Sequence, residues 1–276
     1  MKQNYVVSIL SYNHPDITSR CIRSVLQLVP HEKIFLTHNG SLDRHIETLK
    51  NEFPLIHHNI IKTNRGYSAG ANEALKVAFK ANHAVLFLTN DTELIKISEH
   101  PPDNFSSIKL LRRNSQEIDS VMGSLNPHTG TLKHLKNTKD FQKSHIKYIP
   151  GTAFWISKNI YEDVGGFDES FHTYWEDVDF SLRAQKINLP LDYDENTVCK
   201  HKIGKTCHKD RFYTYDLFQR NRGRFMTKHN LASLKFYPQY LYDIFKYSRS
   251  DFKKAFTIFK THHYKSVQLK DIHEQR

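Results

Sequence analysis

The 276-residue sequence predicts an α/β protein built on a parallel sheet, and two observations carry this prediction. Short apolar, β-branched segments alternate with amphipathic, helix-like segments along the first third of the chain. Each apolar segment is also followed by polar residues, and in parallel sheets ligands bind beyond the carboxyl ends of the strands. The length suits one large domain, or one domain with an extension.

The first two predicted strands both lead into polar clusters. Residues 5–10 (YVVSIL) form the first strand, which ends at Ser11-Tyr12-Asn13. A helix capped by Asp16 is predicted over residues 16–29, because apolar residues recur on one of its faces. The second strand, residues 34–37, ends at His38-Asn39-Gly40-Ser41.

The next two predicted strands repeat this arrangement. A brief strand at Ile60-Ile61 leads into Asn64-Arg65-Gly66, and a helix is predicted over residues 68–81. The fourth strand, residues 84–88 (AVLFL), is followed by Thr89-Asn90-Asp91. The polar clusters are therefore expected to meet at one edge of the sheet.

The remaining sequence is less regular. Residues 96–145 are predicted to be irregular, with hairpin signals between Asn126 and Gly130. Residues 146–156 have strand character around a Pro150-Gly151 break. From residue 212 the chain becomes rich in Phe, Tyr, Lys and Arg and is expected to be helical to about His262, interrupted at Pro238. We therefore divide the chain into a domain at 1–211 and a C-terminal basic, aromatic helical extension at 212–276.

Composition limits the classes of partner and compartment. The net charge of +11 favours anionic partners such as nucleotides, nucleic acid or acidic lipid headgroups. No nucleic-acid-binding module is recognised in the sequence, so we do not expect the protein to bind nucleic acid. Three cysteines are too few for a disulfide framework or a four-cysteine zinc site, which indicates a reducing compartment. Neither a signal peptide nor a membrane-spanning apolar run is apparent, so we expect a cytoplasmic protein.

Three polar motifs are candidates for binding an anionic ligand or a metal. Gly66 and Gly70 allow tight turns before a helix whose N-terminal N–H groups suit a diphosphate, although glycine spacing alone favours a plain strand–helix turn. Asp91, at the end of a strand, can bind Mg²⁺ or Mn²⁺, or can simply cap the next turn. His201 can bind a metal, but in a chain with 18 histidines a packing or surface role is the more frequent one for a single histidine.

The stretch TYWEDVDFSLR, residues 173–183, gathers three carboxylates among aromatic residues. If it forms a helix, Asp179 and Arg183 stand four residues apart and can pair. Asp177 then points elsewhere and is free to act as a general base. The alternative is a capped amphipathic helix whose first-turn acids are favoured by the helix dipole.

Together these motifs resemble the family 2 glycosyltransferases, especially the rhamnosyltransferase-like bacterial enzymes. The matching series covers about residues 5–225 and consists of VVSILSYN, HNGS, TNRGYSAGAN, FLTNDT, YIPGTAFWISKNIYEDVGGFDESFHTYWEDVDFSLR, His201 and Arg220-Asn221. The resemblance implies a GT-A fold, in which a Rossmann-like nucleotide-sugar-binding sheet is joined to an acceptor-binding half. It also implies inverting transfer from a nucleotide-diphosphate sugar.

The resemblance also assigns roles to residues. Asp91 would hold Mn²⁺ or Mg²⁺ on the diphosphate together with His201, Asp177 would deprotonate the acceptor hydroxyl, and Glu176 would orient the acceptor. The donor would be bound by Ser11, Tyr12, Asn13, His38, Asn39, Ser41, Asn64, Arg65, Gly66, Gly70, Asn72 and Asn90. The sugar or acceptor pocket would be lined by Gly151, Thr152, Trp155 and Trp175.

Two residues depart from the pattern of the family. His38 stands where an Asp usually contacts the nucleobase or ribose, which predicts altered base recognition or a weakened donor site. Thr89 replaces the acid or Asn that usually lies two residues before the metal-binding Asp. We therefore expect lower metal affinity, with His201 and the diphosphate supplying more of the coordination.

The C-terminal segment 251–260 (DFKKAFTIFK) predicts an interfacial helix on anionic lipid, because its Phe residues share one face and its Lys residues lie largely off it. The alternative is packing on its own domain or on a second copy of the chain in a homodimer. Membrane contact would suit a lipid-linked acceptor at the inner face of the plasma membrane.

The predicted function is synthesis of a cell-surface polysaccharide or lipopolysaccharide. Two alternatives stay open: a catalytically weak or inactive nucleotide- or glycan-binding relative, which His38 and Thr89 favour, and a sugar nucleotidyltransferase. The second alternative requires a glycine-rich loop directly after the first strand, where SYNHPD stands instead.

Overall fold

The computed structural model describes residues 5–143, 146–201 and 211–247. The chain separates into two compact units, each described here by itself. The larger comprises Met1–Leu125 and Lys133–Cys207, and the smaller comprises Asn126–Leu132 and His208–Arg276. All four candidate catalytic or metal-binding residues belong to the larger unit: Asp91, Glu176, Asp177 and His201.

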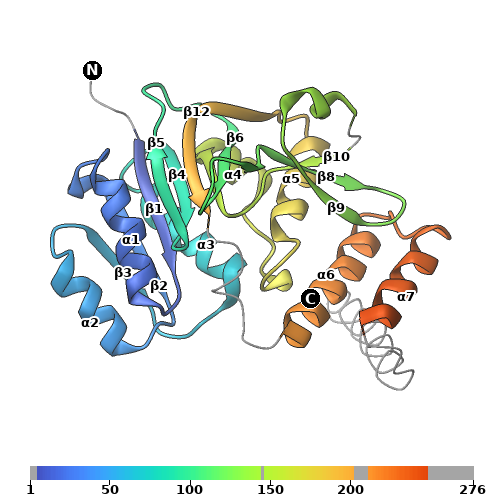
Figure 1. The fold of residues 1–276 in the computed structure, drawn as a ribbon, viewed down its shortest axis with the longest axis horizontal. Helices are drawn as coiled ribbons and strands as arrows, with labels where there is room; N and C mark the ends of the chain where they lie inside the picture. The colour runs from blue at the N-terminus through green and yellow to red at the C-terminus, as the bar shows by residue number, and fades with distance from the viewer. Residues whose placement is uncertain (1–4, 144–145, 202–210, 248–276) are drawn as a thin grey trace. The chain divides into compact units, whose positions relative to one another are not determined.

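The first half of the larger unit has the predicted alternation of strands and helices (Figure 1). Helix α1 begins at Pro15 after His14, whose left-handed backbone marks the N-cap, so the predicted capping role of Asp16 is wrong. Helix α2 was not predicted, because its sequence is polar and only Ile46 and Leu49 are buried. The elements are β1 (Tyr5–Ser11), α1 (Pro15–Leu26), η1 (His31–Lys33), β2 (Ile34–Asn39), α2 (Asp43–Glu52), β3 (His57–Ile61), α3 (Gly66–Ala78) and β4 (Ala84–Thr89).

The second half contradicts the prediction that residues 96–145 are irregular. Strand β6 lies inside the main sheet, between β11 and β12, and its apolar pattern is masked by the buried serines Ser106 and Ser107. The elements are β5 (Thr92–Lys96), β6 (Phe105–Arg112), β7 (Ile118–Ser120), β8 (Met122–Asn126), β9 (Thr131–Leu135), η2 (Thr138–Lys143), β10 (Ile146–Tyr148), β11 (Ala153–Ser157), α4 (Lys158–Val164), η3 (Glu169–Phe171), α5 (Glu176–Lys186) and β12 (Leu191–His201).

The main sheet is mixed rather than wholly parallel, which corrects the sequence prediction. Its principal order is β3-β2-β1-β4-β11-β6-β12-β5, with β7 paired to β6. Strands β3, β2, β1 and β4 are parallel, whereas β11 is antiparallel to both of its neighbours. The carboxyl ends of β1, β2 and β4 therefore share one edge, as predicted. A separate three-stranded sheet has the order β10-β8-β9, and the predicted hairpin joins β8 to β9.

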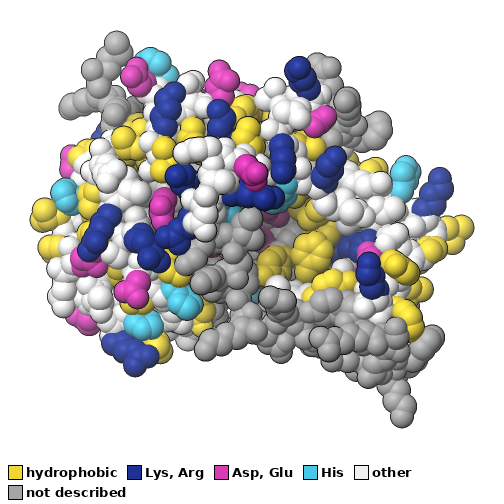
Figure 2. Space-filling view, in the orientation of Figure 1, with side chains coloured by type: hydrophobic (Ala, Val, Ile, Leu, Met, Phe, Trp, Pro, Cys, Tyr) yellow, Lys and Arg dark blue, Asp and Glu magenta, His cyan; other side chains and the backbone are white. Residues whose placement is uncertain are grey.

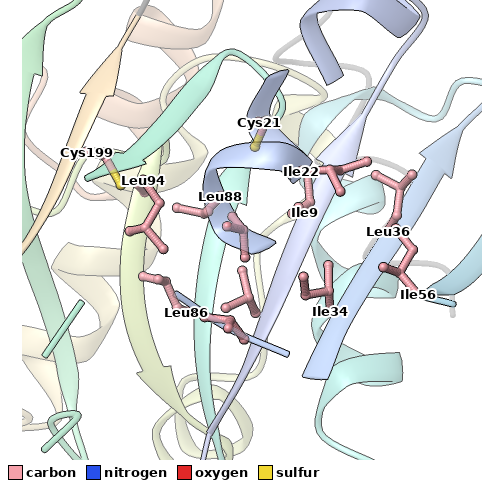
Figure 3. Close-up of a cluster of buried hydrophobic side chains, with 14 of the residues drawn as sticks. Ile9, Cys21, Ile22, Ile34, Leu36, Ile56, Leu86, Leu88, Leu94 and Cys199 are labelled. Carbon is pink, nitrogen blue, oxygen red and sulfur yellow. The ribbon is translucent and has the colours of Figure 1, made fainter. Parts of the chain in front are cut away.

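Alternate side chains of the strands build two cores on the two faces of the sheet. Helices α1 and α2 cover the core that contains Ile9, Leu36, Leu86 and both described cysteines (Figure 3). Helices α3, α4 and α5 contribute to the opposite core, where Phe87, Phe105, Phe154 and Phe180 form ring contacts. Burial raises the pKa of the Cys21 thiol to about 12, so this residue is an inert part of the core.

A double glycine ends α4, and the predicted ion pair of α5 holds the two helices together. Gly165 adopts a left-handed backbone conformation that ends α4. The fully buried Asp179 accepts a 2.8 Å hydrogen bond from Nε of Arg183, which confirms the predicted pairing. The same guanidinium donates to the carbonyl oxygens of Val164 and Gly166. Arg183 thereby fixes the start of α5 against the end of α4.

The smaller unit contains α6 (Arg211–Lys228) and α7 (Phe236–Tyr247). Arg222 donates to Asp243 of α7 at 2.7 Å and to the carbonyl oxygen of Thr129. Pro238 lies in the first turn of α7, where a missing N–H is tolerated, so the predicted interruption falls earlier, at residues 229–235. No helix of the described chain is long and apolar enough to span a bilayer. The predicted helix at 251–260 lies outside the described residues.

Replacing Arg183 by Ala tests the role of the Asp179 pair. Removing the cation leaves a buried carboxylate and two carbonyl groups without their donor, so we expect the free energy of unfolding to fall by about 3–5 kcal/mol. Urea denaturation measures this change. Lys186→Ala, at an exposed position of the same helix, is the control and should change stability by less than about 0.5 kcal/mol. Equal effects of the two substitutions would contradict the assignment.

Candidate active site

The acidic helix α5 begins after a strained turn. His172, Tyr174 and Trp175 have φ values of 60°, 72° and 77°, in the left-handed region that non-glycine residues rarely adopt. Such conformations cost about 1–3 kcal/mol each and concentrate at functional sites. The turn places Glu176 and Asp177 at the N-terminus of α5, as the resemblance requires.

The two neighbouring acids have different environments. Asp177 is partly exposed, and its oxygens accept hydrogen bonds from the N–H groups of Gly151 at 3.0 Å and Val178 at 2.8 Å. Glu176 is buried, and within the described structure its Oε2 has no hydrogen-bond partner. Burial is the main reason that the pKa of each carboxyl is raised, and for Glu176 the charges of Asp177 and Asp179 add to the rise. Because Asp177 accepts from the N–H groups of two other residues while Oε2 of Glu176 has no donor, we assign the proton to Glu176 and the negative charge to Asp177.

The turn between β10 and β11 links Asp177 to the predicted metal ligand Asp91. Gly151 donates to Asp177, and the carbonyl oxygen of Thr152 accepts a hydrogen bond from the N–H of Thr89 at 2.9 Å. The hydroxyl of Thr89 lies 2.6 Å from Oδ1 of Asp91. Thr89, the departure from the family pattern, therefore orients the carboxylate instead of adding a second one.

Asp91 and His201 are brought together, as predicted. His201 ends β12, where it is paired with Thr92 of β5, and its Nε2 lies 3.6 Å from Oδ2 of Asp91. This separation is too long for a hydrogen bond but suits two ligands of one cation, since each metal–ligand distance is about 2.1 Å. No described group of three or more His, Cys, Asp or Glu side chains can hold a metal. The residues fit a cation that takes its remaining oxygens from a bound diphosphate.

The loops after β1 and β2 are held together at the same edge of the sheet. The N–H of Asn13 donates to the hydroxyl of Ser41 at 2.9 Å, and Oδ1 of Asn13 accepts from the N–H of Leu42 at 3.0 Å. Tyr12 is exposed beside them and can contact a ligand. Ser11 and Asn90 are buried, and each is hydrogen-bonded to Thr18 at 2.9 Å. They therefore hold the loop after β1 against α1 and are not exposed to a ligand.

His38 is fully buried and belongs to a chain of histidines. Its Nε2 lies 3.1 Å from Nδ1 of His58, whose Nε2 lies 3.0 Å from the carbonyl oxygen of Phe53. Burial, helped by the charges of His58 and Lys50, lowers the pKa of His38 to about 4, so the ring is neutral at physiological pH. A neutral, buried His38 cannot supply the negative charge that the family's Asp supplies.

The segment before α3 is already hydrogen-bonded within the protein. The first N–H groups of the helix donate to Asn64 (from Gly66, 2.9 Å), to Thr173 (from Tyr67, 3.3 Å) and to the carbonyl oxygen of His172 (from Ser68, 3.1 Å). Arg65 pairs with the exposed Glu169 at 2.8 Å. A diphosphate would need free N–H groups at the start of α3. Two of these N–H groups instead donate to the turn at residues 172–173, and a third donates to Asn64.

Two of the predicted donor-binding asparagines tie segments together. Asn39 donates to the carbonyl oxygen of Gly66 at 2.8 Å and lies so close to Gly70 that a Cβ there would come within 2.6 Å of its amide nitrogen. Asn72 exchanges hydrogen bonds with the backbone of Phe167 at 2.8 and 2.9 Å. These side chains hold α3 against the strand ends and against the double-glycine segment.

Neither predicted pocket tryptophan is accessible. Trp155 is fully buried on β11, and its indole N–H lies 3.0 Å from both Asp194 and Thr197, so it is part of the core rather than of a sugar pocket. Trp175 is 1% exposed. Alternation explains the first error, because Trp155 points to the α1/α2 face of the sheet, opposite to Phe154.

Tyr67 is a site residue that the sequence reasoning did not identify. Its hydroxyl donates to the carbonyl oxygen of Gly151, and a Cβ on Gly151 would lie 2.8 Å from that hydroxyl. Burial and the charges of Glu176, Asp177 and Asp91 raise the pKa of Tyr67 well above its ordinary value. Its place within GYSAG was the only available signal, and nothing in that pattern indicates contact with the acids.

The excess positive charge is not gathered over a single patch on the face that Figure 2 shows. Lys and Arg side chains are interspersed with Asp and Glu there. A continuous basic surface, as a nucleic-acid-binding protein would need, is not seen on this face.

Comparison with solved structures identifies the architecture. GalNAc-T7, solved with UDP, GalNAc and Mn²⁺, has a TM-score of 0.59 at 16% identity, covering 79% of this chain and 47% of that one. The mannosyltransferase PcManGT from Pyrobaculum calidifontis, solved with GDP-Man and Mn²⁺, has a TM-score of 0.53 at 12% identity, covering 95% of this chain and 75% of that one. This chain has the GT-A fold.

Sequence comparison finds a curated relative. The low-salt glycan biosynthesis hexosyltransferase Agl10 of Haloferax volcanii is 27% identical over 185 residues, covering 62% of this chain. The chain spans 59% of the length of that relative. No protein-family model matches the sequence.

Glu176→Gln tests the assignment of the proton to Glu176. A carboxyl whose pKa is raised by folding loses stabilising free energy as pH rises above its unfolded value of about 4.3, so the uncharged amide should stabilise the protein at pH 7 but not at pH 4. Thermal unfolding at both pH values measures the difference. Glu162→Gln, at an exposed position of α4, is the control and should be neutral at both. A variant that is less stable than wild type at pH 7 would contradict the assignment.

Proposed function

We propose that this protein is a metal-dependent, inverting glycosyltransferase that moves a hexose or deoxyhexose from a nucleoside-diphosphate sugar to a hydroxyl of a glycan or lipid-linked acceptor. The observation that carries the proposal is the pair of carboxylates, Asp177 and Asp91, joined by the 150–152 turn in a GT-A fold. The hexosyltransferase name of the curated relative and the nucleotide sugars bound by structural neighbours support it.

Asp177 is suited to remove a proton from the acceptor. Single displacement with inversion needs one base, on the face of the sugar opposite the leaving group. The pKa of Asp177 is raised, which strengthens it as a proton acceptor, while the N–H groups of Gly151 and Val178 hold its carboxylate in one orientation. Glu176, beside the base at the start of α5, is proposed to orient the acceptor without adding charge.

Asp91 and His201 are suited to hold the charge of the leaving group. A divalent cation, Mn²⁺ or Mg²⁺, would neutralise the diphosphate as it departs. Asp91 presents Oδ2 because Thr89 occupies Oδ1, and His201 presents Nε2 from the end of β12. Tyr12, Asn13 and Ser41 at the ends of β1 and β2 are proposed to contact the nucleoside.

A second candidate function is a nucleotide- or glycan-binding protein without turnover. It is favoured by the buried, neutral His38 and by the engaged N–H groups at the start of α3. A sugar nucleotidyltransferase is disfavoured, because β1 is followed by the Asn13-to-Ser41 contact and not by a glycine-rich loop.

Membrane contact is proposed for the smaller unit, in support of a lipid-linked acceptor in cell-surface polysaccharide or lipopolysaccharide synthesis. Helix α7 buries Phe236, Tyr240 and Ile244, yet its outer side is also apolar. Leu234, just before the helix, is 90% exposed, and Tyr242 is 57% exposed. The other exposed apolar residues of this segment are Tyr237, Pro238 and Leu241. Two exposed lysines, Lys235 and Lys246, lie near them in the sequence. Apolar groups flanked by lysines suit an anionic lipid surface.

Asp177→Asn separates an enzyme from a binding protein. The amide keeps the shape but cannot take a proton, so we expect turnover to fall by about 10²–10⁴-fold while donor affinity is retained. Radiometric or coupled transfer assays with UDP- and GDP-sugars, with binding followed by calorimetry, measure both quantities. Asp163→Asn, at an exposed position of α4, is the control. Transfer or donor hydrolysis at the wild-type rate in Asp177→Asn would refute the base assignment.

The full-length Leu241→Ser/Tyr242→Ser variant tests the proposed membrane contact. A fully buried apolar side chain contributes about 1.5–3 kcal/mol, so partitioning onto vesicles containing phosphatidylglycerol should fall at least tenfold. Flotation against vesicles of pure phosphatidylcholine isolates the electrostatic part. Leu55→Ser, which removes another exposed leucine, is the control. Unchanged flotation of the double variant would argue against the contact.

A further inference from the structure

Asp119 lies beside the candidate metal site but has no role in the proposed reaction so far. It belongs to β7, a short strand paired with β6. Its Oδ2 lies 3.9 Å from Nδ1 of His201, and its Oδ1 lies 3.8 Å from Nε of Arg112. The side chain is only 11% exposed, so these neighbours, and not solvent, form most of its surroundings.

His201 stands between two carboxylates. Its Nε2 faces Asp91 at 3.6 Å and its Nδ1 faces Asp119 at 3.9 Å. The two ring nitrogens point away from each other, so a cation bound to Nε2 and Asp91 is out of reach of Asp119. Asp119 is therefore not a third ligand that replaces the acid missing at Thr89, which agrees with the lack of a three-ligand group among the described residues.

We propose that Asp119 is a positioning residue that orients His201 for the metal through Nδ1. A histidine that binds a metal through Nε2 must carry its proton on Nδ1, and that N–H requires an acceptor. Asp119 is the carboxylate on that side of the ring. At 3.9 Å it lies beyond hydrogen-bond distance, so it acts on the ring through charge attraction to the Nδ1–H, which favours the orientation in which the bare Nε2 faces the cation shared with Asp91.

The surroundings of Asp119 suit this role. Arg112 lies 3.8 Å from Asp119, and it also pairs at 3.2 Å with the more exposed Glu117. The backbone contact from Arg112 to Glu117, at 2.9 Å, closes the turn that carries β7. Because β12 pairs with β6 at Arg112 and His201, the same ladder sets the positions of Asp119 and of the histidine. With only two protein ligands expected, the orientation of each has a large effect on affinity.

This inference rests on the proposed metal site, and a double-mutant cycle separates the two. Mn²⁺ affinity of the full-length protein is measured by electron paramagnetic resonance, alone and with UDP or GDP, for Asp119→Ala, His201→Ala and the double variant. Loss of an outer partner typically weakens metal binding about 10–100-fold, and Asp119→Asn, whose amide oxygen keeps a partial negative charge on that side of the ring, should lose less. In the His201→Ala background, Asp119→Ala should have no further effect.

The controls distinguish positioning from a general structural effect. Glu117→Gln shares Arg112 but does not face His201, and it should bind Mn²⁺ like wild type. Metal-free nucleotide binding and thermal stability should be unchanged in Asp119→Asn. If His201→Ala weakens Mn²⁺ binding but Asp119→Ala does not, or if Asp119→Ala weakens it equally without His201, the inference is wrong and the proposed metal site stands. If His201→Ala has no effect, both the metal site and the inference fail.

Discussion

The short turn from Pro150 to Thr152 is the constraint on which the rest of the site depends. Its Gly151 N–H holds Asp177, its Thr152 carbonyl holds Thr89, and Thr89 in turn orients Asp91. The base and the predicted metal ligand come from segments about 90 residues apart, yet three hydrogen bonds relate them. Glycine is required at 151 because the hydroxyl of Tyr67 occupies the space of a side chain. The left-handed backbone at His172, Tyr174 and Trp175 directs the start of α5 toward this turn. The antiparallel pairing of β11 with β4 places the same turn beside Thr89.

The electrostatics of α5 explain why so many acids occupy an aromatic segment. Asp179 is structural and is neutralised by Arg183. Glu176 is buried and Asp177 is partly exposed, and the different hydrogen bonds around them divide the proton and the charge. This arrangement lowers stability at neutral pH, which is the usual consequence of preparing a carboxylate for proton transfer.

Sequence patterns predicted the parallel strands, the edge where their polar ends meet, and the Asp179–Arg183 pair, because each depends on local periodicity or spacing. They failed for β6, whose buried serines conceal a central strand, and for Trp155, whose orientation depends on a register that begins after the Pro150 break. The roles of Asn39, Asn72 and Asp119 could not be predicted, since their contacts are with residues 27, 95 and 82 positions away, respectively. The GT-A fold required the order of several motifs, none of which is decisive by itself.

The central claim is that Asp91 and His201 hold a cation on a diphosphate while Asp177 faces the acceptor. A crystal structure with Mn²⁺ and UDP or GDP tests it most directly, through anomalous scattering from the metal. We expect one Mn²⁺ peak within about 2.0–2.3 Å of Asp91 Oδ2 and His201 Nε2. A nucleotide bound at the ends of β1 and β2 with no metal at these two residues, or a metal bound elsewhere, would contradict it.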